Sequence, residues 1–133
     1  MADADSARMP RPTLVIPRKL AVRLLHEAQL SPEAPVEGLV GGKNNEACSC
    51  YPLRGDVTRA ELLQKVQANS EKPWAWYRSN PQQPAAPVET DKFVAADQAY
   101  SLIISLNTKG VLEMRCWDWG SGAPIEREIT IKD

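Results

Sequence analysis

The sequence predicts one α/β domain, of the α+β kind, in which helices pack on a mixed β-sheet. Residues 17–30 repeat apolar side chains with a helical period, and a second helical stretch follows a capping box at residues 58–61. Three short apolar or alternating stretches, 100–106, 111–119 and 125–131, lie toward the C-terminal end. Helices and strands are therefore interleaved along the chain.

The length of 133 residues suits a single domain that buries about two-thirds of its unfolded surface. We therefore expect it to fold without a disulfide or a metal. Residues 1–13 contain Pro10 and Pro12 and no apolar pattern, so we expect a flexible N-terminal arm followed by one domain over residues 14–133.

The charge of the chain argues against two classes of partner. The formal net charge is −1, from 16 basic and 17 acidic residues that are interspersed, so a nucleic-acid partner is not expected. No apolar run approaches the ~20 residues that cross a bilayer, and the N-terminal residues lack the apolar core of a signal peptide. We expect a cytoplasmic protein that does not enter a membrane.

The three cysteines, Cys48, Cys50 and Cys116, are an odd number and predict reduced structural thiols rather than a disulfide framework. A thiolate metal site would need a fourth donor, and His26 is the one histidine of the chain. The helical period places His26 opposite the apolar face of its helix, where it is expected to be solvent-exposed.

The N-terminal half is expected to contain a strand, a helix, a hairpin and a second helix. Residues 14–16 form the strand, and Pro17 suits the first turn of the helix, which Pro32 and Pro35 end. One helix face carries Leu20, Ala21, Leu24, Leu25 and Ala28, while Arg18, Lys19, Arg23 and Glu27 lie off it. Strands 36–42 and 47–51 are joined by a polar turn, and Thr58 caps a helix over residues 59–68.

The C-terminal half begins with an aromatic strand from Trp74, which runs into a Pro/Gln-rich loop. A third helix is expected over residues 91–99, and a central strand over residues 100–106. In the strand over residues 111–119, Leu112, Met114 and Cys116 alternate with Glu113, Arg115, Trp117 and Trp119. A last strand, 125–131, is expected to place Ile125, Arg127, Ile129 and Ile131 on one face.

Several segments in this order resemble a known domain family. They are Ile16–Leu20, the Pro- and Gly-containing stretch Pro32–Gly42, Ala75–Pro81 (AWYRSNP), Val88–Asp91 and the strand YSLIISL that starts at Tyr100. Together they resemble the JAB/MPN domain, also called JAMM or Mov34, over nearly the whole chain. The resemblance implies a three-layer, cytidine-deaminase-like architecture and, often, a homodimer formed through helices.

Active members of that family are zinc-dependent isopeptidases and related hydrolases. In their motif, two histidines and an aspartate hold Zn²⁺ with one position left for water, a glutamate acts as general base and a serine stabilises the oxyanion. Carried onto this sequence, the two histidine positions are Arg78 and Asn80, the serine position is Val88, and Asp91 alone is retained. Arginine has no lone pair for a metal, and a neutral amide is a poor zinc ligand.

The general-base position is also altered. Alignment of Gly38 and the residues after it with the family pattern puts Pro35 at the glutamate position, so Glu33 or Glu37 could serve only after a local shift. We therefore expect a catalytically inactive JAB/MPN-like domain, a pseudo-metallopeptidase without a cofactor. Arg78 and Asp91 could instead form an ion pair in the vacated site.

The expected role is that of a protein-binding or scaffold module, with the tail of a ubiquitin-like or sulfur-carrier protein as candidate partner. Arg78 suits a carboxylate, and Trp76 and Tyr77 are aromatic types favoured in interfaces, although Trp76 could equally pack beneath a helix. The alternative is a zinc-dependent metallopeptidase or isopeptidase with atypical ligands, drawn from Glu33 or Glu37, Asp91 and His26.

Overall fold

The computed structural model describes residues 14–30, 33–44, 46–80, 85, 100–105, 113–119 and 123–133. In chain order its elements are β1 (Leu14–Pro17), α2 (Arg18–Gln29), β2 (Glu37–Lys43), β3 (Glu46–Pro52), α3 (Arg59–Ala68), β4 (Lys72–Asn80), β5 (Tyr100–Ser105), β6 (Glu113–Asp118), β7 (Ile125–Arg127) and β8 (Ile129–Lys132). The predicted helix 91–99 and the N-terminal arm lie outside the described residues.

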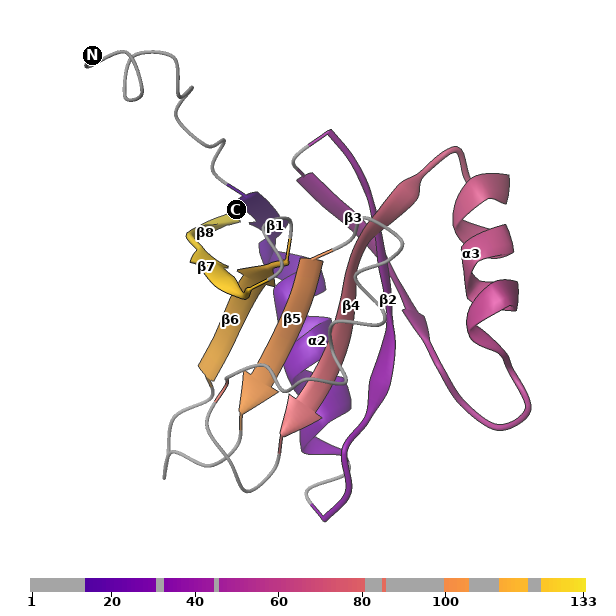
Figure 1. Cartoon of the computed structure of the whole chain (residues 1–133), viewed down its shortest axis with the longest axis horizontal. Helices are drawn as coiled ribbons and strands as arrows, with labels where there is room; N and C mark the ends of the chain where they lie inside the picture. Colours follow the sequence, from indigo (N-terminus) through magenta and orange to yellow (C-terminus); the bar gives the residue numbers. More distant parts are fainter. Residues whose placement is uncertain are drawn as a thin grey trace.

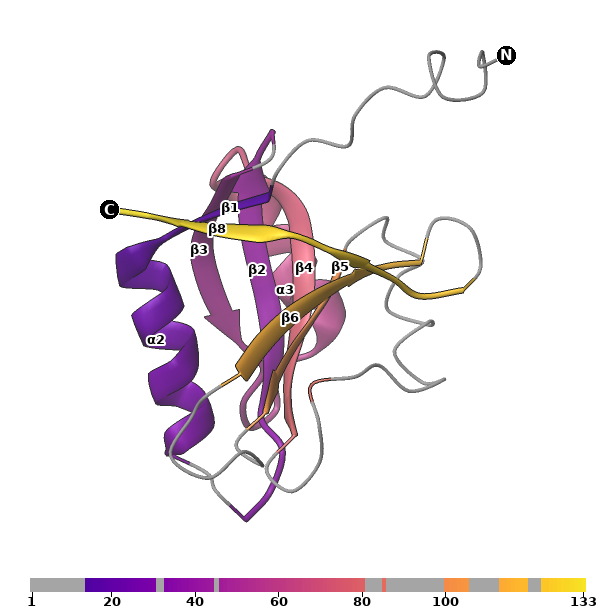
Figure 2. The same ribbon diagram turned by 90° about the vertical axis from the view of Figure 1, so that its left-hand side faces the viewer.

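The strands form one mixed sheet in the order β7-β6-β5-β4-β2-β3-β1-β8 (Figure 1). The pairs β4–β5, β1–β3 and β1–β8 are parallel, and the other neighbours are antiparallel. The two views show α2 and α3 on opposite sides of this curved sheet (Figures 1 and 2). The predicted α/β fold with helices on a mixed sheet is confirmed.

Each helix covers its own apolar cluster. The larger cluster joins α2 to the inner face of the sheet and includes Leu20, Leu24, Tyr77, Leu102 and Ile104. The smaller cluster, beneath α3, consists of Leu39, Leu62, Val66 and Trp76. Burial of each large side chain contributes about 1.5–3 kcal/mol of transfer free energy, so both helices are held mainly by packing.

The predicted bounds of both helices are confirmed to within a residue. Helix α3 is capped by Thr58, whose hydroxyl accepts a hydrogen bond from the backbone N–H of Glu61 at 3.2 Å, as expected for a capping box. His26 is exposed, as its helical phase predicts. No helix among the described residues has the length and apolar character that a membrane crossing demands.

The prediction that Glu27 lies on the polar face of α2 is wrong. The sequence placed it away from the apolar face, whereas its side chain is nearly buried and forms an ion pair with Arg54. Arg54 follows β3, 27 residues further along the chain, so helical periodicity could not reveal this partner. The hydrogen bond to Glu27 raises the pKa of the Arg54 guanidinium.

The last predicted strand, 125–131, is also corrected, because the structure divides it. Residues of β7 pair with β6, whereas β8 pairs with β1 at the other end of the sheet. The chain thus reaches both ends of the sheet and bends it toward a near-barrel. The predicted common face is lost: Arg127 is buried, while Ile125 and Ile131 are 39% and 41% exposed.

Candidate functional site

The candidate site lies where β4 ends, between β2 and β5. Arg78 at the end of β4 is the register partner of Glu37, the first residue of β2, and of Ile103 in β5. Two register pairs earlier along β4, Trp76 faces Leu39. Because side chains alternate along strands, Glu37 and Arg78 belong to the same sheet face as Leu39 and Trp76, which is the face covered by α3.

Helix α3 adds a second guanidinium group to this place. Nη2 of Arg59, the first residue of α3, lies 3.0 Å from Oε1 of Glu37. The same guanidinium lies over the ring of Trp76, 5.6 Å from its centroid. Glu37 is therefore flanked by Arg59 from α3 and by Arg78 from β4, and we call these residues with Trp76 the Glu37–Arg59–Trp76–Arg78 cluster.

The backbone around the cluster is held by Ser79, a residue to which sequence reasoning assigned no role. Its hydroxyl accepts a hydrogen bond from the Val36 N–H at 2.8 Å, and its own N–H donates to the Val36 carbonyl at 2.9 Å. The carbonyl of Glu37 accepts from the Leu53 N–H at 2.9 Å. Ser79 is fully buried, so the ends of β2 and β4 are held together where the cluster lies.

Of the three predicted binding residues, two are core side chains. Trp76 packs beneath α3 at 5% exposure, which is the packing alternative that the sequence allowed. Tyr77 is 2% exposed and points to the opposite face, where its hydroxyl lies 3.6 Å from Sγ of Cys50. Arg78 is half-buried, so of the three side chains it is the most accessible to a partner.

Burial dominates the electrostatics of the Tyr77–Cys50 pair. Desolvation raises the pKa of the Tyr77 phenol far above its ordinary value, and the neighbouring Cys50 raises it further. Desolvation also raises the pKa of the Cys50 thiol, an effect that its hydrogen bond to Tyr77 partly opposes. Both groups stay neutral at physiological pH, so neither offers an activated nucleophile.

The remaining predicted site residues divide into two groups. Glu37 is the register partner of Arg78, whereas Glu33 is exposed and precedes β2. Asn80 is half-buried at the last position of β4. Val88 and Asp91 lie outside the described residues, and the proposed ion pair between Arg78 and Asp91 stays a prediction.

The described residues at this place do not fit a zinc ion. Arg78 offers positive charge and no lone pair, and Asn80 offers a neutral amide. Within the described ranges no three His, Cys, Asp or Glu residues are grouped so that they could hold a metal. His26, a ligand in the alternative set, projects from α2, and that helix packs on the sheet face opposite Glu37.

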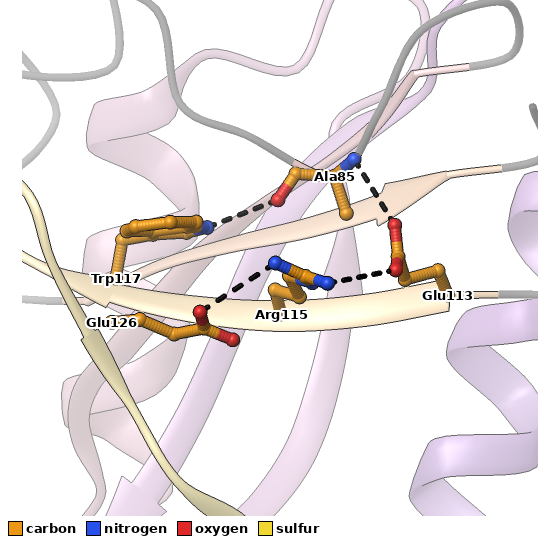
Figure 3. A network of polar contacts seen from close by, with 5 residues as sticks. All are labelled: Ala85, Glu113, Arg115, Trp117 and Glu126. Atoms are coloured by element: carbon orange, nitrogen blue, oxygen red, sulfur yellow. Dashed lines mark hydrogen bonds and ion pairs between the residues drawn. The ribbon is translucent and has the colours of Figure 1, made fainter.

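The connection between β4 and β5 is anchored to β6 at Ala85 (Figure 3). The Ala85 N–H donates to Oε1 of Glu113 at 3.4 Å, and its carbonyl accepts from Nε1 of Trp117 at 3.1 Å. Arg115, between them in β6, pairs with Glu113 at 3.1 Å and with Glu126 at 3.6 Å. The alternation of residues 113–117 predicted a shared face, but nothing in the sequence indicated Ala85 as its partner.

Comparisons with known proteins were made with the sequence and with the fold. No family model matches the sequence, and no curated protein matches it. The fold matches a solution structure of protein DSY2949 from Desulfitobacterium hafniense, with 23% identity, a TM-score of 0.75, and coverage of 91% of this chain and 94% of that one.

Two further solved structures carry the name of the resembled family. The JAB1/MPN domain protein AF2198 from Archaeoglobus fulgidus matches with 16% identity and a TM-score of 0.63, over 90% of this chain and 100% of that one. A structure described as a JAMM metalloprotease-like zinc site in the proteasome and signalosome matches with 16% identity and a TM-score of 0.61, over 90% and 99%.

These matches show the class of fold, which is JAB/MPN-like. At identities this low, a match establishes the backbone architecture but not an activity, because function depends on the site residues that a fold presents. The α/β fold that the sequence resemblance implies, with helices packed on a mixed sheet, is thus confirmed.

Proposed function

We propose that this chain is a catalytically inactive JAB/MPN-like domain that acts as a protein-binding or scaffold module. The observation that carries the proposal is the Glu37–Arg59–Trp76–Arg78 cluster at the end of β4, where the resembled motif would begin its metal ligands. Two guanidinium groups flank one carboxylate there. Among the described residues, guanidinium groups at this place disfavour a bound cation and offer hydrogen-bond donors to an anionic group.

The chemistry of these side chains supports loss of hydrolysis. A catalytic zinc site needs three protein ligands of nitrogen, sulfur or charged oxygen type, and Arg78 and Asn80 supply none of them. The carboxylate of Glu37, the better placed candidate base, already accepts an ion-pair hydrogen bond from Arg59. Neither metal activation of water nor proton abstraction is supported by this donor set.

The same cluster supports recognition of a carboxylate. Guanidinium groups bind carboxylates through paired hydrogen bonds, and the half-buried position of Arg78 strengthens such contacts relative to open solvent. The candidate ligand is the C-terminal tail of a ubiquitin-like or sulfur-carrier protein. Arg59 would contribute if the tail competes with Glu37 for its guanidinium.

Metal content tests the loss of the catalytic centre. The chain is purified without added zinc, incubated with zinc, desalted and measured by elemental mass spectrometry. We expect far less than one zinc per chain, before and after incubation. Near-stoichiometric zinc that disappears in an Asp91→Ala variant would refute the proposal and favour the alternative, a zinc-dependent hydrolase with atypical ligands.

Peptide titration tests the binding role. Tail peptides with a free C-terminal carboxylate are compared with the same peptides amidated at the C-terminus. Arg78→Ala is expected to weaken binding of the free acid roughly tenfold, as loss of a charged hydrogen bond does, and Arg23→Ala is the matched control because Arg23 is exposed on α2. Equal affinity of both peptide forms for the native chain would contradict carboxylate recognition.

A further inference from the structure

A second surface lies away from the cluster, between α2 and the C-terminal strand. An apolar groove of about 320 Å³ is lined by Arg18, Ala21, Val22, Leu25, Met114, Ile129 and Ile131. Two of these apolar side chains are unusually accessible, Val22 at 59% and Ile131 at 41% exposure. Both side chains line the same groove, so their exposed apolar surfaces adjoin.

The groove runs beside the unpaired edge of β8. Strand β8 is the last of the sheet, and within the described part of the chain β1 is its one hydrogen-bonded neighbour. Met114, on the far side of the groove, comes from β6, which does not pair with β8. The backbone N–H and C=O groups on the second edge of β8 are therefore available to another strand.

The rim of the groove is basic. An adjoining hollow is lined by Pro17, Arg18, Lys19, Val22, Lys132 and Asp133. Arg18 pairs with Asp133, and Lys132 lies 3.3 Å from Glu46. Lys19 makes no ion pair with any of the residues described, so its ammonium group is available to an acidic side chain of a partner. Figure 2 shows this end of β8 beside the first turn of α2.

From the open edge, the apolar groove and the basic rim together, we propose that β8 receives an extended segment of a partner protein. The segment adds as a strand to the free edge of β8 through backbone hydrogen bonds. Its alternate apolar side chains enter the groove over Val22 and Met114. Acidic residues at its end meet Lys19 and Lys132. This surface is separate from the cluster and does not depend on the function proposed there.

Two other occupants suit this surface less well. A second copy of the chain docking through the same patch would bring like charges together, because an isologous interface pairs a surface with itself. A lipid surface would leave the edge backbone groups of β8 without hydrogen-bond partners, which hydrocarbon does not tolerate. A polypeptide strand satisfies both requirements.

The test uses the isotope-labelled full chain and a short synthetic peptide in which isoleucine and threonine alternate, with glutamates at one end and both termini blocked. Binding is followed by NMR at the amides of residues 129–132 and of α2. We expect saturable shifts at these amides and slower hydrogen exchange along β8. Peptide in the millimolar range that leaves these amides unshifted would overturn the proposal.

Matched probes separate the three parts of the proposal. A peptide methylated on alternate backbone nitrogens keeps its side chains but cannot pair with β8, so equal binding would exclude strand addition. Val22→Glu should weaken binding at least fivefold, whereas Leu30→Glu should leave it unchanged because Leu30 is 63% exposed but does not line the groove. Lys19→Glu should weaken the glutamate peptide about two- to fivefold and favour a lysine-ended one.

Two further measurements can overturn the choice of occupant. Sedimentation equilibrium of the chain alone would reveal self-association that Val22→Glu abolishes, which would assign the groove to a second copy. The chain could also co-sediment with vesicles containing phosphatidylglycerol while the peptide fails to bind. If Val22→Glu abolished that co-sedimentation, the groove would be assigned to a lipid surface. Because Val22 is exposed, circular dichroism of the variant should match that of the native chain.

Discussion

Gly38→Ala is expected to destabilise the fold, because the site leaves no room for a methyl group. A Cβ at residue 38 would lie 2.4 Å from both Cε2 and the hydroxyl oxygen of Tyr77, closer than such contacts occur. Tyr77, in β4, is 2% exposed and packs in the larger apolar cluster, so its ring cannot move away freely. Overpacking of this kind costs about 1–3 kcal/mol, and we expect a value in the upper half of that range.

Thermal and urea unfolding of native and variant chains measure this loss. For a domain of this size each kcal/mol corresponds to roughly 3–5 °C, so the midpoint should fall by roughly 6–15 °C. Tyr77→Phe removes one of the clashing atoms, so the double variant should lose less than the sum of the two single losses.

Gly55→Ala is the control for the backbone contribution. Gly55 has φ of +60° and nothing within 4 Å of its would-be Cβ, so its cost of roughly 1–2 kcal/mol comes from conformation alone. Its effect should add to that of Tyr77→Phe without coupling. A Gly38→Ala variant as stable as the native chain would refute the steric reasoning. So would an equal coupling free energy between Tyr77→Phe and each of the two glycine substitutions.

Three further predictions concern stability. Thr58→Ala should cost about 1 kcal/mol by removing the cap of α3, and Thr58→Ser should restore most of it; equal midpoints in urea for all three chains would contradict the cap. Arg54→Ala should destabilise more than Glu27→Gln, because it leaves the nearly buried carboxylate charged and unpaired, whereas glutamine is neutral; the reverse order in thermal unfolding would show that the pair is not the cause. Burial raises the pKa of the Cys116 thiol from 9.0 to about 12, so its neutral form stabilises the fold fully below pH 9 and this contribution is lost as pH rises from 9 toward 12. Cys116→Val should therefore flatten the alkaline decline in stability by up to about 1.4 kcal/mol per pH unit, and an unchanged slope in urea titrations would contradict the assignment.

The cluster and the groove divide the molecule into two surfaces of different chemistry. The cluster combines two guanidinium groups with a carboxylate on the α3 side of the sheet, at the end of β4. The groove combines apolar side chains with an open strand edge on the α2 side. The two proposals are therefore independent, and variants in one surface should leave the binding proposed for the other unchanged.

Local patterns in the sequence determined most of the elements of this fold. The period of the apolar residues in 17–30 and the capping box at Thr58 specify helices through contacts three or four residues apart, and both helices form where expected. That Arg78 and Asn80 stand at the two histidine positions of the resembled motif stays a prediction, which rests on the identity and spacing of residues in the sequence.

Only the tertiary structure decided how distant segments meet. Residues 125–131 alternate like one strand, yet they divide at Glu128. The residues before it pair with β6 and those after it pair with β1, at opposite ends of the sheet. Arg59 reaches Glu37, and Arg54 reaches Glu27, across gaps of 22 and 27 residues that no local period can report. Among the described residues, the open edge of β8 follows from the same long-range pairing, because it depends on which strands pair with one another.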